Sequence, residues 1–116
     1  DIISLHCAAS PETFHVMNTE RLALMKKDAY LINTARGDVV DETALARALS
    51  EKRIGGAGLD VFQGEPVISS ALLEAPNTVL LPHLGSATVE TRTAMGLKVV
   101  ENARAFFAGQ PLIDPV

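Results

Sequence analysis

Short apolar runs alternate with longer stretches of mixed polarity along this chain. Apolar and β-branched residues that follow one another with little polar alternation are typical of strands buried in a parallel sheet. The strands that we predict cover residues 1–6, 29–33, 54–61 and 79–81. The third run contains Gly55, Gly56 and Gly58, which indicates close approach of another backbone or of a ligand.

Two of the intervening stretches carry apolar residues at helical spacing. Asn18 or Thr19 is expected to cap a helix that extends to Lys27. Asp41 is expected to cap a second helix. The apolar stripe of this second helix comprises Leu45, Ala48 and Leu49. Both stretches therefore predict helices that connect consecutive strands.

The longest predicted helix runs from Thr88 to Ala108, with Gly109 at the position where helices commonly end. Its apolar side comprises Val89, Thr93, Leu97, Val100, Ala103 and Phe107. Residues 64–78 are rich in Pro, Ser and Asn, so we predict a loop with one helical turn at 71–74. Prolines in residues 110–116 predict an irregular tail.

The alternation of strands and helices predicts an α/β fold, with a parallel sheet and helices on its faces. Right-handed crossovers place the carboxyl ends of all strands at one edge of such a sheet. The residues expected at this edge are His6, Cys7, Thr34, Ala35, Arg36, Asp60 and His83, with Glu65 slightly beyond the third strand. Open α/β sheets bind ligands at this edge, so a site is expected there.

Composition limits the class of protein. The 116 residues are 47% hydrophobic and 21% charged, which suits one small globular domain rather than a disordered chain. A net charge of −4 without a basic run argues against nucleic-acid binding. The single cysteine, Cys7, rules out an internal disulfide and suggests a reducing compartment. No membrane-length apolar run or signal peptide is visible, so we expect a cytoplasmic location.

Each candidate residue has a functional and a structural interpretation. His83 is either a general acid/base or a buried structural histidine. Arg36 either binds a carboxylate or phosphate with its planar fork, or fixes a surface loop. Asp60 either meets a ligand or caps a turn, and Glu65 is either solvated or paired with His83. Ser86 and Thr88 either bind an anion at a helix start or cap the helix.

Several other kinds of site lack support in the chain. His6, Cys7 and His15 do not have the spacing of metal ligands, so no metal site is predicted. The chain contains no P-loop, no nucleophile elbow and no zinc-protease motif. A G-x-G-x-x-G turn is absent as well, and with it the usual cradle for dinucleotide phosphates.

Four ordered motifs together resemble the D-isomer-specific 2-hydroxyacid dehydrogenases. They are Ser4-Leu5-His6-Cys7 followed by Ser10-Pro11-Glu12-Thr13, Asn33-Thr34-Ala35-Arg36-Gly37, Gly58-Leu59-Asp60-Val61-Phe62 followed by Glu65-Pro66, and Pro82-His83-Leu84-Gly85-Ser86-Ala87-Thr88. The resemblance covers essentially the whole chain. It implies an oxidoreductase that uses NAD or NADP and acts on a small 2-oxo or 2-hydroxy acid, and that is a homodimer when full length.

The resemblance also implies roles for individual residues. Arg36 would bind the carboxylate and 2-oxo group of the substrate. Glu65 would pair with His83, and His83 would give a proton to the carbonyl oxygen as hydride arrives at C2. The residues implied in cofactor binding are Cys7, Thr34, Ala35, Arg36, Asp60, His83, Gly85 and Ser86. These roles suit a reaction in which the cofactor supplies the hydride and the protein orients the substrate and supplies positive charge.

Part of the family's pattern lies outside this chain. Its glycine-rich turn and the acidic residue that reads the ribose would precede Asp1, as would most of the substrate domain. Residues 1–85 therefore resemble the second half of a Rossmann-type dinucleotide-binding domain, and residues 86–116 a return helix and tail that join the substrate domain. We expect the isolated piece to be inactive. Ala8 also replaces a proline that is usual in the family.

The turn at Gly85-Ser86-Ala87-Thr88, followed by Thr91-Arg92 and Met95, looks most like glyoxylate/hydroxypyruvate reductases. Another member of the family, of the phosphoglycerate or D-lactate type, is one alternative. A nucleotide-sensing binding protein similar to transcriptional co-repressors is another. Glu65 and this turn argue against a formate dehydrogenase, which typically carries glutamine as the partner of the histidine. A structural domain with a coincidental triad is the remaining alternative.

Overall fold

The chain forms two compact units, Asp1–His83 and Leu84–Val116. The computed structural model describes residues 1–115. The first unit contains a four-stranded sheet and three α-helices, and the second contains one long helix and a tail. None of the helices within residues 1–115 is both long and apolar enough to cross a lipid bilayer.

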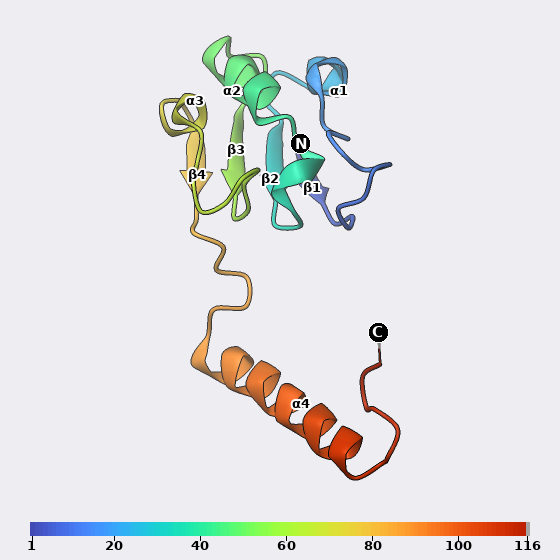
Figure 1. The fold of residues 1–116 in the computed structure, drawn as a ribbon. Helices are drawn as coiled ribbons and strands as arrows, with labels where there is room; N and C mark the ends of the chain where they lie inside the picture. The colour runs from blue at the N-terminus through green and yellow to red at the C-terminus, as the bar shows by residue number, and fades with distance from the viewer. Residues whose placement is uncertain (116) are drawn as a thin grey trace. The chain divides into compact units, whose positions relative to one another are not determined.

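The sheet confirms the predicted parallel α/β fold. Its strands are β1 (Ile2–Leu5), β2 (Tyr30–Asn33), β3 (Gly56–Leu59) and β4 (Thr78–Leu80). They lie in the order β1-β2-β3-β4, and all arrows in Figure 1 point the same way. Leu5 pairs with Asn33, Asn33 with Leu59, and Leu59 with Leu80. All four strands therefore end at the same level, and the residues that follow them emerge along one edge.

The helices of the first unit are α1 (Thr19–Leu24), α2 (Glu42–Ser50) and α3 (Ser70–Leu73), with a 3₁₀ turn at Gly37–Val39. Both predicted caps are present, because Asn18 accepts a hydrogen bond from the N–H of Arg21 and Asp41 one from that of Ala44. The prediction that the first helix reaches Lys27 is wrong. Met25 already has an extended backbone (φ −67°, ψ 148°), because the chain turns there toward β2.

One face of the sheet forms the core. Leu31, Leu45 and Leu72 are fully buried, and the buried side chains of the strands and of α1, α2 and α3 form a single cluster. Successive strands joined by crossovers of one hand place all of their helices on one face. Residues on the other side of the pleat are exposed, such as Tyr30 (50%) and Val79 (62%).

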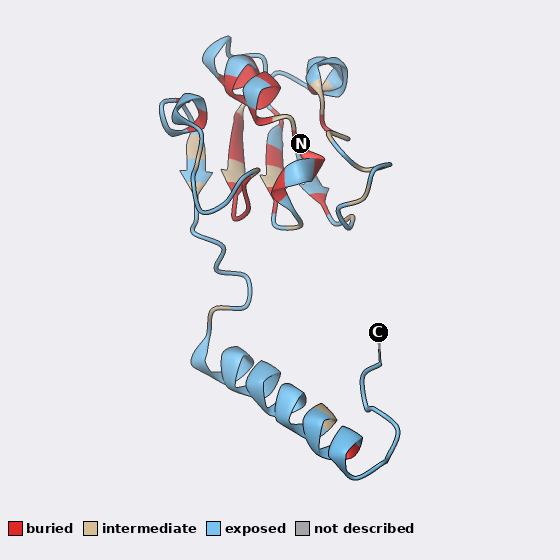
Figure 2. Cartoon of the chain, in the orientation of Figure 1, coloured by how far each residue is buried: buried red, intermediate tan, exposed pale blue. Residues whose placement is uncertain are grey.

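The prediction that the first strand is buried is wrong for most of its length. Ile2 and Ile3 are 70% and 37% exposed, and only Leu5 joins the core (Figure 2). These residues are exposed because β1 lies at the edge of the sheet and pairs with β2 alone. The glycine-rich third strand is also shorter than predicted. It does admit a neighbouring backbone, since a Cβ on Gly56 would lie 2.7 Å from the carbonyl oxygen of Asn77.

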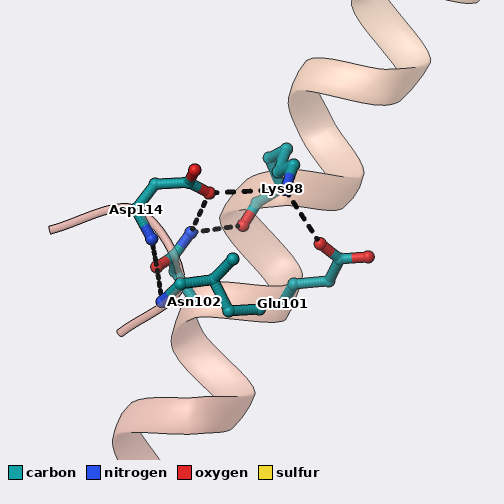
Figure 3. A network of polar contacts seen from close by, with 5 residues as sticks. Lys98, Glu101, Asn102 and Asp114 are labelled. Atoms are coloured by element: carbon teal, nitrogen blue, oxygen red, sulfur yellow. Dashed lines mark hydrogen bonds and ion pairs between the residues drawn. The ribbon is translucent and has the colours of Figure 1, made fainter. Parts of the chain in front are cut away.

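The second unit is built on α4 (Val89–Phe107). Thr88 caps it by accepting a hydrogen bond from the N–H of Thr91, and Gly109 follows its end at φ +66°, as predicted. Its apolar residues are largely exposed, and Ala105 alone is buried (Figure 2). The tail has no helix or strand in residues 110–115 and is held by Asn102, whose Oδ1 accepts from the N–H groups of Ile113 and Asp114 (Figure 3).

Candidate active site

The turn after β2 presents Arg36. Asn33, the last residue of β2, is 1% exposed, and its side chain folds this turn. Asn33 Nδ2 donates to the carbonyl oxygen of Arg36 at 2.8 Å, and Asn33 Oδ1 accepts from the N–H of Ala35 at 3.1 Å. The side chain of Arg36 is exposed at the carboxyl edge of the sheet. A buried amide thus fixes the backbone that carries an exposed guanidinium.

Glu65 and His83 lie in hydrogen-bond contact at the same edge. His83 Nδ1 is 2.8 Å from Glu65 Oε2, although the two residues are far apart in sequence. The second oxygen of Glu65 accepts from the N–H of Phe62 at 2.8 Å. The Glu65–Pro66 peptide bond is cis. Both carboxylate oxygens are therefore engaged, which sets the orientation of the carboxylate against the imidazole ring.

The charge state of this pair follows from its surroundings. The hydrogen bond from His83, the N–H of Phe62 and the positive charge of Arg36 together hold the pKa of Glu65 below its ordinary value. Glu65 is therefore an acceptor near neutral pH, and Nδ1 of His83 carries the hydrogen of the bond. Nε2 of His83 is the ring nitrogen that does not face Glu65.

The structure argues against one of the two interpretations of His83. Its side chain is 48% exposed, which is incompatible with a buried structural histidine. Its backbone also has φ +55°. A non-glycine residue in this region costs on the order of 1–3 kcal/mol, and such residues cluster at functional sites. His83 thus has an exposed imidazole ring and an unfavourable backbone conformation at the edge of the sheet.

A cleft at the ends of β1 and β2 brings four of the predicted cofactor residues together. Its volume is about 550 Å³, and its lining residues are Leu5, His6, Cys7, Ala8, Ala9, Thr34, Ala35 and Arg36. This size and position suit one end of a dinucleotide. Asp60, which follows β3, is 5% exposed and donates its backbone N–H to Asn33 at 3.0 Å. Gly85 and Ser86 belong to the second unit, and their role stays a prediction.

Among the other polar residues, His6 bonds to Ser4 at 2.8 Å and His15 lies against Gln63. Within residues 1–115, no three His, Cys, Asp or Glu side chains are grouped closely enough to hold a metal ion. At the start of α4, Thr88 acts as the helix cap.

Sequence reasoning did not predict the contacts of two residues that hold the site together. Gly37 follows Arg36, and a Cβ on it would overlap the backbone of Phe62 and Gln63. Glu42, the first residue of α2, is 7% exposed and contacts the same segment. Gly37 belongs to the motif Asn33–Gly37, but nothing in the motif indicates its contact with Phe62 and Gln63. Glu42 has no local signal, because an acidic residue in a first helical turn normally serves the helix dipole.

We expect Gly37→Ala to lower the stability of the full-length protein by about 1–3 kcal/mol, as overpacking a well-filled site generally does. The neighbour that must move is backbone rather than a flexible side chain. Gly58→Ala is the matched control, because its Cβ would meet only Ile32 Cδ1, at 3.1 Å. Denaturant unfolding measures both, and equal stabilities for the two variants would contradict the close approach at Gly37.

Comparisons with known proteins identify a family and several similar proteins. Residues 1–85 match the family model described as "D-isomer specific 2-hydroxyacid dehydrogenase, NAD binding domain". The chain is 51% identical over 116 residues to a 2-ketogluconate reductase of Gluconobacter oxydans, covering 100% of this chain and 37% of that protein. It is 50% identical over 110 residues to a glyoxylate reductase of Thermococcus litoralis, covering 95% and 33%.

A solved structure is similar over the same region. It is the NADPH-dependent glyoxylate/hydroxypyruvate reductase of Sinorhizobium meliloti in complex with NADP and malonate. The TM-score is 0.94 at 42% identity, covering 100% of this chain and 36% of that one. The chain thus spans about a third of the length of these relatives.

Proposed function

Since the chain belongs to the D-isomer specific 2-hydroxyacid dehydrogenase family, we propose that its full-length protein is an NAD(P)-dependent oxidoreductase. The reaction transfers a hydride between NAD(P)H and the 2-oxo group of a small 2-oxo acid, in the manner of a glyoxylate/hydroxypyruvate reductase. The observation that carries the proposal is the 2.8 Å contact between Glu65 and His83, close enough to Arg36 for its charge to act on Glu65.

Arg36 binds and polarises the substrate in this proposal. Its planar fork matches a carboxylate with two parallel hydrogen bonds, which orients the acid. The same positive charge lies near the 2-oxo oxygen, where negative charge develops during reduction. Preorganised charge at that position stabilises the transition state more than the bound substrate.

His83 is the proton donor. The nicotinamide cofactor, when bound, supplies the hydride that reaches C2 of the substrate. Nε2 of His83 gives its proton to the carbonyl oxygen, which becomes the 2-hydroxyl group, and the imidazole is left neutral. Glu65 holds the ring by Nδ1 and stabilises its protonated form before transfer. In the oxidation direction, neutral His83 takes the proton back from the hydroxyl group.

The cleft at β1 and β2 supports a proposal for the cofactor residues. Cys7, Thr34 and Ala35 line it beside Arg36, where the nicotinamide end of NAD or NADP would lie. Asp60, His83, Gly85 and Ser86 complete the set that we assign to the cofactor. The phosphate cradle is not among the described residues of this chain.

We further propose that the full-length protein is a homodimer in the cytoplasm and has no nucleic-acid partner. The net charge of −4 and the absence of basic runs support the last point. The single cysteine, Cys7, suits a reducing compartment.

Steady-state assays of the full-length protein test the proposed activity. Glyoxylate, hydroxypyruvate, 2-ketogluconate and phosphohydroxypyruvate are each offered with NADH and with NADPH. We expect turnover of glyoxylate or hydroxypyruvate, with a kcat/KM of roughly 10⁴ M⁻¹s⁻¹ or more for the preferred pair. A preference for phosphohydroxypyruvate would instead indicate a phosphoglycerate-type dehydrogenase. Nucleotide binding without turnover of any 2-oxo acid would favour the binding protein.

A further inference from the structure

Glu42 is a buried acidic residue for which the reaction above has no use. It is the first residue of α2, where acidic side chains usually face solvent and interact with the helix dipole. Here the side chain is turned inward, with the residue 7% exposed. Glu42 Oε1 accepts a hydrogen bond from the backbone N–H of Gln63 at 2.5 Å. Burying a carboxylate is costly unless it serves as a hydrogen-bond acceptor, and this contact provides that role.

The partner of Glu42 lies in the loop that carries Glu65. Two consecutive N–H groups of this loop donate to glutamates, Phe62 to Glu65 and Gln63 to Glu42. On another side, the backbone of Phe62 and Gln63 packs against Gly37, next to Arg36. The side chain of Gln63 is braced by His15 Nε2 at 3.1 Å. The loop is therefore held between Gly37 and Glu42 just before it delivers Glu65 to His83.

We propose that Glu42 is a positioning residue: by accepting the Gln63 N–H, it holds the Phe62–Glu65 loop where Glu65 reaches His83. The inference rests on the proposed function, because it assigns Glu42 to the proton-donating pair of that reaction. Glu42 acts through Glu65, so its removal changes the rate of proton transfer more than the binding of the substrate by Arg36.

Substitutions of Glu42 can test its hydrogen bond and its negative charge separately. Burial raises the pKa of Glu42, and the carboxylates of Asp38 and Glu65 add to this, whereas the Gln63 N–H and His15 oppose it. The surroundings therefore disfavour the charged form of Glu42. The property on which the loop depends is the oxygen that accepts the hydrogen bond from the Gln63 N–H. A glutamine has an oxygen at the same place and no charge, so Glu42→Gln keeps the positioning contact and Glu42→Ala removes it.

The test compares these variants in the full-length protein with its 2-oxo acid. For Glu42→Ala we expect kcat to fall about tenfold or more, a partial loss of the roughly 10²–10⁴-fold contribution of general acid catalysis, with KM for the 2-oxo acid changed less than threefold. The acidic limit of the pH profile should move to higher pH, because Glu65 loses the hydrogen bond from His83 that holds its pKa below the ordinary value. Glu42→Gln should stay within about threefold of the wild type, since a neutral acceptor replaces a charged one.

A control variant and a second measurement distinguish a positioning role of Glu42 from a general loss of stability. Glu20→Ala removes an exposed first-turn glutamate of α1 and should leave kcat and the pH profile unchanged. The ring signals of His83 in long-range ¹H–¹⁵N NMR spectra report its contact with Glu65 whether or not the protein turns over. These signals should change in Glu42→Ala and be retained in Glu42→Gln. If Glu42→Ala does not fold, Glu42→Met fills the volume without an acceptor oxygen.

Three results would overturn the positioning role. One is a Glu42→Ala protein with wild-type kcat, pH profile and His83 signals. Another is a Glu42→Gln protein as impaired as Glu42→Ala, which would make the charge the important property. A third is a rise in KM alone. An inactive wild-type protein would overturn the proposed function instead, and the His83 signals would still decide whether Glu42 positions the pair.

Discussion

His83→Gln is expected to lower kcat for 2-oxo acid reduction by about 10²–10⁴-fold, the usual contribution of a positioned general acid. Glutamine keeps a polar side chain of similar length but has no proton to give at neutral pH. KM for the 2-oxo acid should change much less, because Arg36 still binds the carboxylate. Steady-state kinetics of the full-length protein measure both parameters.

The backbone of His83 requires controls for this prediction, because its φ is +55°. His83→Asn places a residue that tolerates this conformation at the same position and should lose as much activity. Asn77→Gln strains a comparable position, at φ +54°, and should leave kcat unchanged. A wild-type kcat in both His83 variants would exclude His83 as the proton donor.

Arg36→Ala is expected to raise KM for the 2-oxo acid and to lower kcat by roughly 10²–10³-fold, as does the loss of a preorganised donor in other enzymes. The two parameters move together because, in the proposed mechanism, the guanidinium binds the carboxylate in the ground state and stabilises charge on the 2-oxo oxygen in the transition state. Arg36→Lys should recover part of kcat, since it restores the charge without the bidentate fork.

The control for Arg36 is an arginine in an exposed turn outside the site. Arg53→Ala should leave KM and kcat at their wild-type values. If Arg36→Ala instead behaves like Arg53→Ala, the residue only fixes a surface loop, as its position in the sequence also allowed. Thermal unfolding of both variants separates a loss of substrate contacts from a loss of stability.

Much of the fold could be predicted because it is encoded locally. The apolar runs identified the four strands, and the caps at Asn18, Asp41 and Thr88 are short-range contacts within a few residues. The parallel order then follows from connecting each strand to the next through a helix. The end of α1 at Leu24 and the exposure of Ile2 could not be predicted in this way, because both depend on neighbours distant in sequence.

The same distinction between local and long-range contacts applies to the candidate site. The sequence by itself placed Arg36, Asp60 and His83 after strands whose carboxyl ends share one edge, since strand positions and connection rules suffice for that. Only the tertiary structure decided that His83 is exposed and bonded to Glu65, and that Gly37 and Glu42 hold the loop between them. Such contacts join residues about twenty or more positions apart, and their geometry is set by packing rather than by local preference.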